Sequence, residues 1–174
     1  MITTARLVLR EWRDDDADPL ARLHESAEMM RYLGGPMSRA ACDEMLTRLR
    51  THWETRGFGA WAVEHEGRLA GMVGIIVPRW ESRFMPCVEI LWRLDPALWG
   101  RGLVTEAARA SLRDGFEEHG FDEVLAFTVP KNERSWRVME RLGMTRNPDD
   151  DFDHPLVPDG DPQRRHICYR IKRS

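Results

Sequence analysis

The 174-residue chain lacks most features that mark specialised protein classes. Its three cysteines, Cys42, Cys87 and Cys168, lie far apart and form no CxxC pair, which argues against zinc or redox chemistry. Reduced thiols of this kind are typical of a cytoplasmic protein. No apolar run approaches the roughly 20 residues that span a bilayer, and the N-terminus shows no apolar signal segment. We therefore expect a cytoplasmic protein with no membrane partner and no bound metal.

An excess of basic residues is missing as well. Lys and Arg number 26 against 29 Asp and Glu, giving a formal net charge of -3. A nucleic-acid binder is expected to carry a basic stripe, so no nucleic-acid partner is predicted. The length suits one compact domain, and a hydrophobic content of 42% is enough for a core. Without repeats or linkers, the chain is predicted to be a single domain over residues 1–174.

The hydrophobic pattern that is present changes period along the chain. Residues 6–10 alternate as a strand does, an acidic run before Pro19 marks a helix start, and apolar residues recur at helical spacing between Ser38 and Gly57. Residues 59–64 and 69–77 suit a hairpin. The pattern then predicts strand 87–94, helix 103–118, strand 123–129, helix 133–141 and strand 166–171. This order predicts an α+β fold, an α/β/α sandwich with helices on both faces of a mixed central sheet.

The most informative segment reads Trp99-Gly100-Arg101-Gly102-Leu103-Val104-Thr105-Glu106-Ala107 and joins a strand to a helix. Glycines let the backbone approach a ligand closely and take positive φ angles. The first helical turn leaves N–H groups unpaired at the positive end of the helix dipole, which favours phosphate. A Walker A loop is excluded because Gly-Lys-Ser/Thr is absent. The dinucleotide fingerprint is excluded by Thr105, which stands at its third glycine. Glycine spacing alone leaves a tight turn without a ligand open.

This segment, from Leu98 to Ala107, resembles the pyrophosphate loop of GNAT acetyltransferases, in the form found in the ribosomal-protein-acetyltransferase-like branch. The resemblance covers almost the whole chain, from the opening strand 6–10 through the hairpin 59–63 and 69–74 to Asn132-Glu133-Arg134-Ser135 and Arg141-Leu142-Gly143-Met144. Two positions depart from the superfamily pattern: Trp99 replaces the usual Gln or Arg, and Val104 replaces a small residue. The resemblance implies a GNAT fold with a mostly antiparallel sheet that splays between its fourth and fifth strands.

The resemblance also implies how acetyl-CoA, the acetyl donor, would be held. The pyrophosphate would accept hydrogen bonds from the backbone of Gly100, Arg101, Gly102, Leu103 and Val104. The pantetheine arm would pair with backbone groups near Trp92, Arg93 and Leu94, one of which would polarise the thioester carbonyl. Asn132 would bind the pantetheine, cap the following helix, or do both. The Arg101 side chain would pair with a phosphate or remain solvated.

Two catalytic candidates follow from the same resemblance and from the chemistry. The tyrosine that many GNAT enzymes use to protonate the leaving thiolate is absent, so Ser135 becomes the candidate acid, with plain helix capping as the alternative. An alkyl amine is only about one part in a thousand neutral at pH 7. A base would ease this, and Glu89 is the first candidate, with His154 and Glu64 as weaker ones.

The acceptor is less well defined. The acidic stretch 149–154 lies in a long loop, 147–163, and would either attract a cationic amine or be solvated. Trp12, Trp80 and Trp92 would line a pocket or belong to the core. The leading prediction is an N-acetyltransferase acting on a protein N-terminus or a small amine. A non-catalytic acyl-CoA sensor and a nucleotide-binding module unrelated to CoA remain alternatives, and a homodimer is suggested by analogy.

Overall fold

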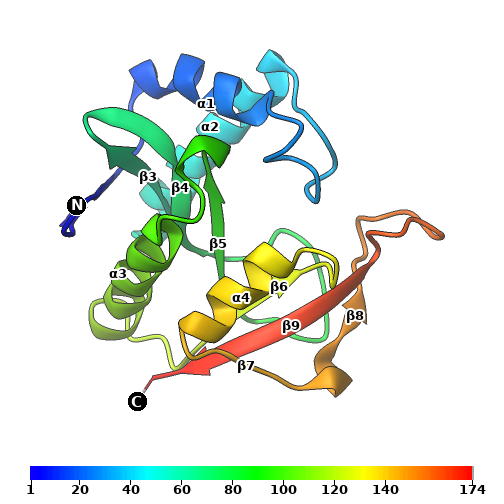
Figure 1. Ribbon diagram of the computed structural model, residues 1–174. Helices are drawn as coiled ribbons and strands as arrows, with labels where there is room; N and C mark the ends of the chain where they lie inside the picture. Colours follow the sequence, from blue (N-terminus) through cyan, green and yellow to red (C-terminus); the bar gives the residue numbers. More distant parts are fainter. Residues whose placement is uncertain (174) are drawn as a thin grey trace.

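The computed structural model describes residues 1–173; Ser174, the last residue of the predicted domain, lies outside the described part (Figure 1). Nine strands form the sheet in the order β1-β2-β3-β4-β5-β6-β9-β7, with β8 paired to β9. The strands are β1 (Ile2–Thr3), β2 (Val8–Arg10), β3 (Ala60–His65), β4 (Arg68–Ile76), β5 (Glu89–Leu94), β6 (Glu123–Thr128), β7 (Thr145–Arg146), β8 (Phe152–Asp153) and β9 (Arg165–Lys172). Only β5 and β6 pair in parallel, and the other pairs are antiparallel.

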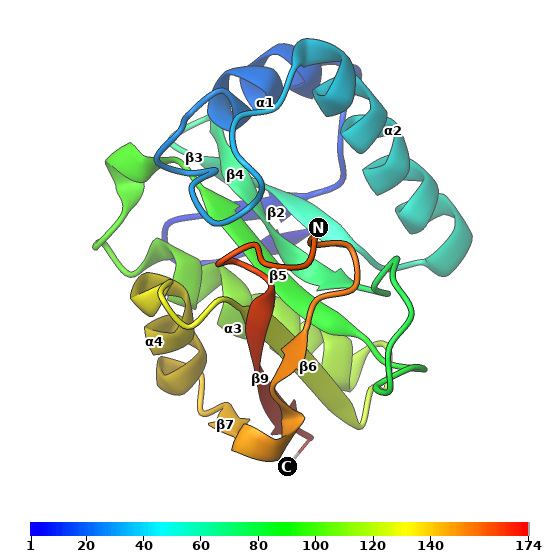
Figure 2. The ribbon, with the colours of Figure 1, turned by 90° about the vertical axis from the view of Figure 1, so that its right-hand side faces the viewer.

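Helices cover both faces of this sheet (Figures 1 and 2). They are α1 (Ala17–His24), α2 (Arg39–Arg56), α3 (Leu103–Glu117) and α4 (Glu133–Arg141), with single 3-10 turns η1 (Asp14–Asp16), η2 (Pro96–Leu98) and η3 (Pro148–Asp150). One buried cluster joins the sheet to α3 and α4, and a second joins it to α1 and α2. The predicted α/β/α sandwich is therefore confirmed. None of the helices described is both long and apolar enough to cross a membrane.

Local signals in the sequence fix α2 most clearly. The Ser38 hydroxyl accepts a hydrogen bond from the Ala41 N–H at 3.2 Å, as expected of an N-cap. Gly57 ends the helix in the left-handed conformation, with φ of 73°. The short strands β1, β7 and β8 were not predicted, because two residues each are too few to show alternation. The 3-10 turn η3 and the strand β8 both lie inside the predicted loop 147–163.

The central sheet opens between β5 and β6, as predicted. The two strands share one paired position, Glu89 with Leu125, where the Leu125 N–H donates to the Val88 carbonyl at 3.0 Å. In contrast, β4 and β5 remain paired over six positions. Beyond Glu89 the edge of β5 is therefore without a strand partner along the side that faces β6. The bare edge leads directly to the loop before α3.

Candidate active site

The loop before α3 has the backbone geometry of an anion site. Gly100 and Gly102 both adopt a φ of 76°, a left-handed conformation that strains other residues. Gly102 is also the N-cap of α3 and provides no side-chain cap. The first intrahelical bond runs from the Glu106 N–H to the Gly102 carbonyl at 3.1 Å. The N–H groups of residues 103–105 consequently have no helical partner and are available to a ligand at the positive end of the dipole.

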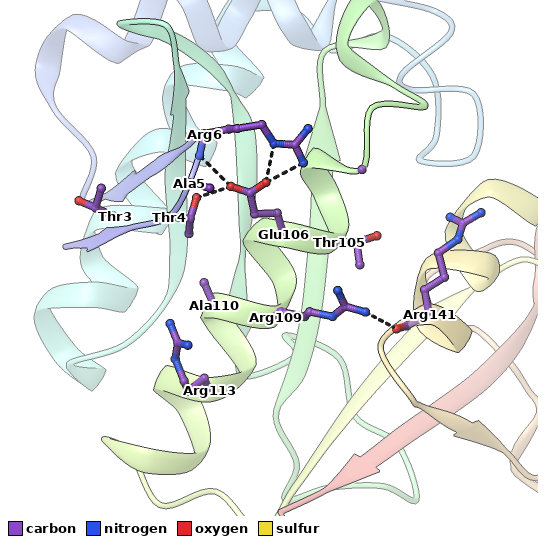
Figure 3. Close-up of a pocket in the computed structure, with 11 residues that line it drawn as sticks. Thr3, Thr4, Ala5, Arg6, Thr105, Glu106, Arg109, Ala110, Arg113 and Arg141 are labelled. Carbon is purple, nitrogen blue, oxygen red and sulfur yellow. Dashed lines mark hydrogen bonds and ion pairs between the residues drawn. The ribbon is translucent and has the colours of Figure 1, made fainter.

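Arg6 and Glu106 hold this loop in place (Figure 3). The Arg6 guanidinium donates to the Arg101 carbonyl at 2.8 Å and to the Glu106 carboxylate at 2.7 Å. The Thr4 hydroxyl and the Arg6 N–H also donate to Glu106, at 2.6 and 2.9 Å. This clamp was not predicted from the sequence, although Glu106 stands in the Thr-Glu-Ala segment that carries the resemblance. The clamp ties the N-terminal segment to the loop and the first turn of α3.

The remaining side chains of the loop explain its departures from the superfamily pattern. The Trp99 indole donates to the Leu94 carbonyl at 2.7 Å and so closes the turn from β5 to the loop. Val104 packs against the core, and Leu103 is fully buried. Valine therefore leaves the backbone N–H of its position free for a ligand. The Arg101 side chain is exposed, with no carboxylate of residues 1–173 within 4 Å.

The backbone of β5 presents alternate residues to the gap. Val88 directs its carbonyl to β6, whereas Asp95 directs its N–H to the Ala70 carbonyl of β4 at 2.8 Å. Because successive peptide groups of a strand point to opposite edges, Trp92 and Leu94 face the gap. Arg93 was also expected to offer its backbone to the pantetheine, but its peptide groups do not face the gap.

The Arg93 peptide groups face β4, where its carbonyl lies against Gly71. A Cβ atom on Gly71 would stand 2.1 Å from the Arg93 oxygen. At the other edge of the strand, the Leu94 carbonyl is already engaged by Trp99. Among the three residues expected to bind the pantetheine, the free backbone groups along the gap are therefore the N–H and carbonyl of Trp92 and the N–H of Leu94. The Trp92 side chain is partly buried and packs against the core cluster that joins the sheet to α3 and α4.

The start of α4 lies next to the loop. The Arg134 guanidinium sits 4.7 Å from the centre of the Trp99 ring. The Asn132 side chain donates to the Thr128 hydroxyl at 3.1 Å and makes no helix-capping bond. Ser135 is half-buried, and its hydroxyl has no hydrogen-bond partner within the described chain. The turn after β6 thus brings the start of α4 against Trp99 and leaves the Ser135 hydroxyl available.

Glu89 lies on the face of the sheet that carries α1 and α2, opposite Ile76 of β4. Burial raises the pKa of its carboxyl from 4.5 to about 7, although the nearby Arg93 charge acts to lower it. The other base candidates are occupied. Glu64 accepts from Arg10 at 2.9 Å. His154 accepts at Nδ1 from the Leu156 N–H, and burial lowers the pKa of its imidazole to about 4.

An aromatic cluster lies on the same face of the sheet as Glu89. It is formed by Trp80, Phe84, Phe127, Phe152, His154 and His166. Phe127 shares the face of Glu89, because Glu89 pairs with Leu125 and side chains alternate along β6. Trp80 stacks on Phe152 with ring centres 5.2 Å apart. Trp80 thus belongs to a cluster on the same face of the sheet as the candidate base, whereas Trp12 is a core residue that donates to the Ala60 carbonyl at 2.8 Å.

The acidic stretch 149–154 is largely neutralised by arginines. Asp150 pairs with Arg170, and Asp151 pairs with Arg146. Asp153 lies 3.5 Å from Arg165. These contacts remove most of the field that would attract a cationic amine. The structure therefore favours a structural role for this stretch.

A hollow of about 740 Å³ lies on the outer surface of α3, beside the glycine loop (Figure 3). Gly102, Arg109, Arg113 and Arg141 contribute to its lining. Arg109 donates to the Arg141 carbonyl at 3.0 Å and links α3 to α4. Within residues 1–173, no carboxylate lies within 4 Å of these three guanidinium groups. The hollow is consequently positive and continuous with the loop.

Comparisons with known proteins agree with this architecture. Residues 6–145 match the family model of the Acetyltransferase (GNAT) domain. YkkB of Bacillus subtilis is 32% identical over 151 residues, covering 82% of this chain and 84% of that protein. The FsC-acetyl coenzyme A-N(2)-transacetylase of Aspergillus fumigatus is 32% identical over 149 residues, covering 82% of this chain and 63% of that protein.

Solved structures show the same fold. An acetyltransferase from Agrobacterium tumefaciens superposes with a TM-score of 0.78 and 26% identity, covering 99% of this chain and 94% of that chain. RimL, a ribosomal alpha-N-protein acetyltransferase in complex with coenzyme A, superposes with a TM-score of 0.74 and 15% identity, covering 98% and 96%. The fold, the glycine loop and the family match lead to one assignment. The chain belongs to the GNAT acetyltransferase family.

Proposed function

We propose that the protein transfers the acetyl group of acetyl-CoA to a primary amine by direct attack. The observation that carries this proposal is the continuity of an anion-binding loop with a bare strand edge. The N–H groups of residues 103–105 suit a pyrophosphate, and the free groups of Trp92 and Leu94 suit an amide-containing chain. Pantetheine carries two amides between the pyrophosphate and the thiol, so one molecule can use both features.

The positive hollow beside the loop accounts for the rest of the donor. CoA carries a third phosphate on its adenosine ribose. The hollow adjoins Gly102 and presents Arg109, Arg113 and Arg141, none of which is neutralised by a carboxylate in the described chain. The adenosine end is therefore expected to lie over α3, with its phosphate near these arginines.

The proposed chemistry assigns one proton to each catalytic residue. Glu89, with a pKa of about 7, is partly ionised at neutral pH and takes the proton from the attacking amine, directly or through water. The Trp92 N–H donates to the thioester oxygen as negative charge develops there. The C–N bond forms as the C–S bond breaks, and the Ser135 hydroxyl donates its proton to the departing sulfur while taking one from a solvent water, so that no serine alkoxide is left. Asn132 helps to position the pantetheine at the start of α4.

The relatives support N-acetylation as the reaction type. The Aspergillus fumigatus protein is described as an N(2)-transacetylase that uses acetyl coenzyme A. RimL is described as an alpha-N-protein acetyltransferase and was solved with coenzyme A. Both descriptions fit an amine acceptor and a CoA donor, and RimL supports the ribosomal-protein-acetyltransferase-like branch.

A thiol-release assay tests the proposal. The protein is incubated with acetyl-CoA and a panel of peptides and small amines, and free CoA is measured together with the acetylated product. Amine-dependent release is expected. Tight binding of acetyl-CoA without release for any amine would favour the non-catalytic sensor. Nucleotides that raise the melting temperature as much as acetyl-CoA does would favour a nucleotide-binding module.

A further inference from the structure

The side chain of Arg93 is not explained by the acetyl donor. Its side chain lies on the α1–α2 face of the sheet, contacting His24 at the end of α1 and Met45 of α2. The glycine loop and the positive hollow belong to α3, which covers the opposite face. Arg93 therefore lies on the same side as Glu89, four residues along the same strand.

The contacts of Arg93 orient its guanidinium without compensating its charge. Nη1 donates to His24 Nε2 at 3.1 Å and approaches the Met45 sulfur at 3.5 Å. The other ring nitrogen of His24 donates to the Leu20 carbonyl at 2.9 Å. Burial, with a smaller effect from Arg93, lowers the pKa of His24 to about 4, so the imidazole is neutral at physiological pH. No carboxylate of residues 1–173 lies within 4 Å of Arg93.

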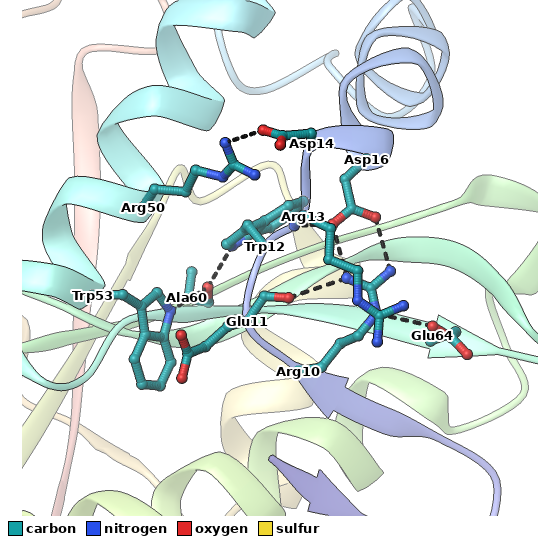
Figure 4. Close-up of polar contacts among 10 residues, drawn as sticks. All are labelled: Arg10, Glu11, Trp12, Arg13, Asp14, Asp16, Arg50, Trp53, Ala60 and Glu64. Atoms are coloured by element: carbon teal, nitrogen blue, oxygen red, sulfur yellow. Dashed lines mark hydrogen bonds and ion pairs between the residues drawn. The ribbon is translucent and has the colours of Figure 1, made fainter.

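A second arginine in the same chain shows what a purely structural arrangement looks like (Figure 4). Arg10 is buried, and it donates to both oxygens of Asp16 at 2.8 Å and to Glu64 at 2.9 Å. A desolvated guanidinium without such partners costs several kcal/mol. Arg93 has five N–H donors. Its contacts with His24 and Met45 both involve Nη1. Its remaining nitrogens are not sealed from solvent. Two nitrogens of the half-buried Arg93 side chain are therefore left without a hydrogen-bond partner in the described chain, although they are not fully desolvated.

We propose that Arg93 binds a carboxylate or phosphate group of the acceptor, so that the substrate is an amine that also carries an anion. The proposal rests on the proposed acetyl transfer, with the amine placed at Glu89. A planar guanidinium fork recognises both oxyanions through paired hydrogen bonds. Four residues of strand separate the two Cα atoms by roughly 13 Å. The anionic group is therefore several bonds away from the amine.

The surroundings agree with an anionic acceptor. The acidic stretch that would repel it is neutralised, because Asp150 and Asp151 pair with arginines. The nearest acid along β5, Glu89, is held partly protonated by burial. His24 acts as a positioning residue: it fixes the guanidinium through a neutral nitrogen and leaves the positive charge for the ligand.

The test uses four acceptors of equal length: an ω-amino carboxylic acid, its carboxamide, an ω-amino alkyl phosphate and a plain alkylamine. The wild-type protein is expected to favour the acid or the phosphate over the carboxamide at least tenfold in kcat/KM. Arg93→Gln should remove this preference by raising KM for the anionic acceptors at least tenfold. Its KM values for acetyl-CoA and for the carboxamide should stay within about twofold, whereas kcat can fall equally for all acceptors because the Arg93 charge also lowers the pKa of Glu89. Comparing kcat/KM for the ω-amino carboxylic acid and the ω-amino alkyl phosphate identifies which oxyanion the Arg93 guanidinium prefers.

Controls separate recognition from folding. Arg56→Gln removes an exposed arginine at the end of α2 and should leave the preference intact. His24→Phe should weaken the preference, and His24→Gln, which keeps an acceptor for Arg93, should restore part of it. Equal use of acid and carboxamide by the wild type, or an equal fall in kcat/KM for both in Arg93→Gln, would overturn the proposal.

A second measurement keeps this inference separate from the proposed reaction. If no amine releases CoA, acetyl transfer fails as the function, and thermal unfolding then reports on the anion site. The ω-amino acid and inorganic phosphate should still raise the melting temperature of the wild type more than that of Arg93→Gln. Equal shifts in both proteins would overturn the role of Arg93 whatever the reaction is.

Discussion

Replacing Glu89 with glutamine should slow the enzyme and stabilise the fold, with both effects depending on pH. Burial raises the pKa of the Glu89 carboxyl to about 7, so the folded chain holds its proton more tightly than the unfolded chain, which releases it near 4.5. The stability that this proton contributes is fully present below pH 4.5. It is lost as the pH rises through about 7, where the folded carboxyl ionises.

The size of the effect follows from the same shift. One pKa unit corresponds to about 1.36 kcal/mol, so the ionisation of Glu89 costs the fold about 3 kcal/mol above pH 8. Glutamine stays neutral and avoids that loss. Urea unfolding at pH 5 and pH 8.5 isolates this effect when wild type and Glu89→Gln are compared, because the other titrating groups, among them His24 and His154, are shared by both proteins. Relative to Glu89→Gln, the wild type should lose about 2.5 kcal/mol between these pH values, because the unfolded carboxyl is already partly ionised at pH 5.

Activity should change in the opposite direction. Glu89 must be ionised to accept a proton, so kcat/KM of the wild type should rise with pH through about 7. Glu89→Gln should lower kcat/KM at least tenfold at pH 7.5 and lose that rise. Glu117→Gln, at the exposed end of α3, is the matched control. Parallel pH–stability curves for wild type and variant would refute the raised pKa, and an unchanged pH–rate profile would refute the catalytic role.

Other substitutions address the remaining parts of the molecule. Ser135→Ala should lower kcat more than tenfold with little change in acetyl-CoA affinity, because only the proton donor is removed; unchanged turnover in a steady-state assay would exclude Ser135 from the mechanism. Gly102→Val should abolish acetyl-CoA binding in calorimetry, since valine cannot adopt the φ of 76° without strain that moves the loop. Normal affinity would contradict the phosphate assignment. Asp16→Asn should reduce stability by about 3–5 kcal/mol, because it leaves the buried Arg10 charge poorly compensated. A loss below about 1 kcal/mol in chemical denaturation would contradict this role.

Elements with local signals could be predicted from the sequence. The helix α2 was predicted because Ser38 and Gly57 mark its two ends, and the opening between β5 and β6 followed from the family resemblance. The strands β1, β7 and β8 could not be predicted, because two residues carry no period. Their positions depend on pairing with β2 and β9, which only the folded sheet brings next to them.

The site divides in the same way. The glycine loop is a continuous segment, so its conformation could be predicted from the glycines at 100 and 102. The Arg6–Glu106 clamp joins residues 100 positions apart, and the Arg93–His24 contact spans 69 positions. The hydrophobic pattern and motifs of a short segment cannot predict contacts between residues so far apart in the sequence. The direction of the Arg93 backbone toward β4 depends on register, which is likewise a property of the assembled sheet.

The pairing register also explains why composition is a poor guide to the charge of the acceptor. Arg10, Ala62, Met72 and Arg93 form one row across β2 to β5, so both arginines lie on the same face of the sheet. At the β2 end of the row, carboxylates from η1 and β3 neutralise Arg10. At the β5 end, a neutral imidazole holds Arg93 and no carboxylate of the described chain approaches it. A chain with a formal net charge of -3 thus presents, on the face that also carries Glu89, a cation with no carboxylate of the described chain in direct contact. The local charge at Arg93, and not the sign of the net charge of the protein, therefore decides which acceptors bind on this face.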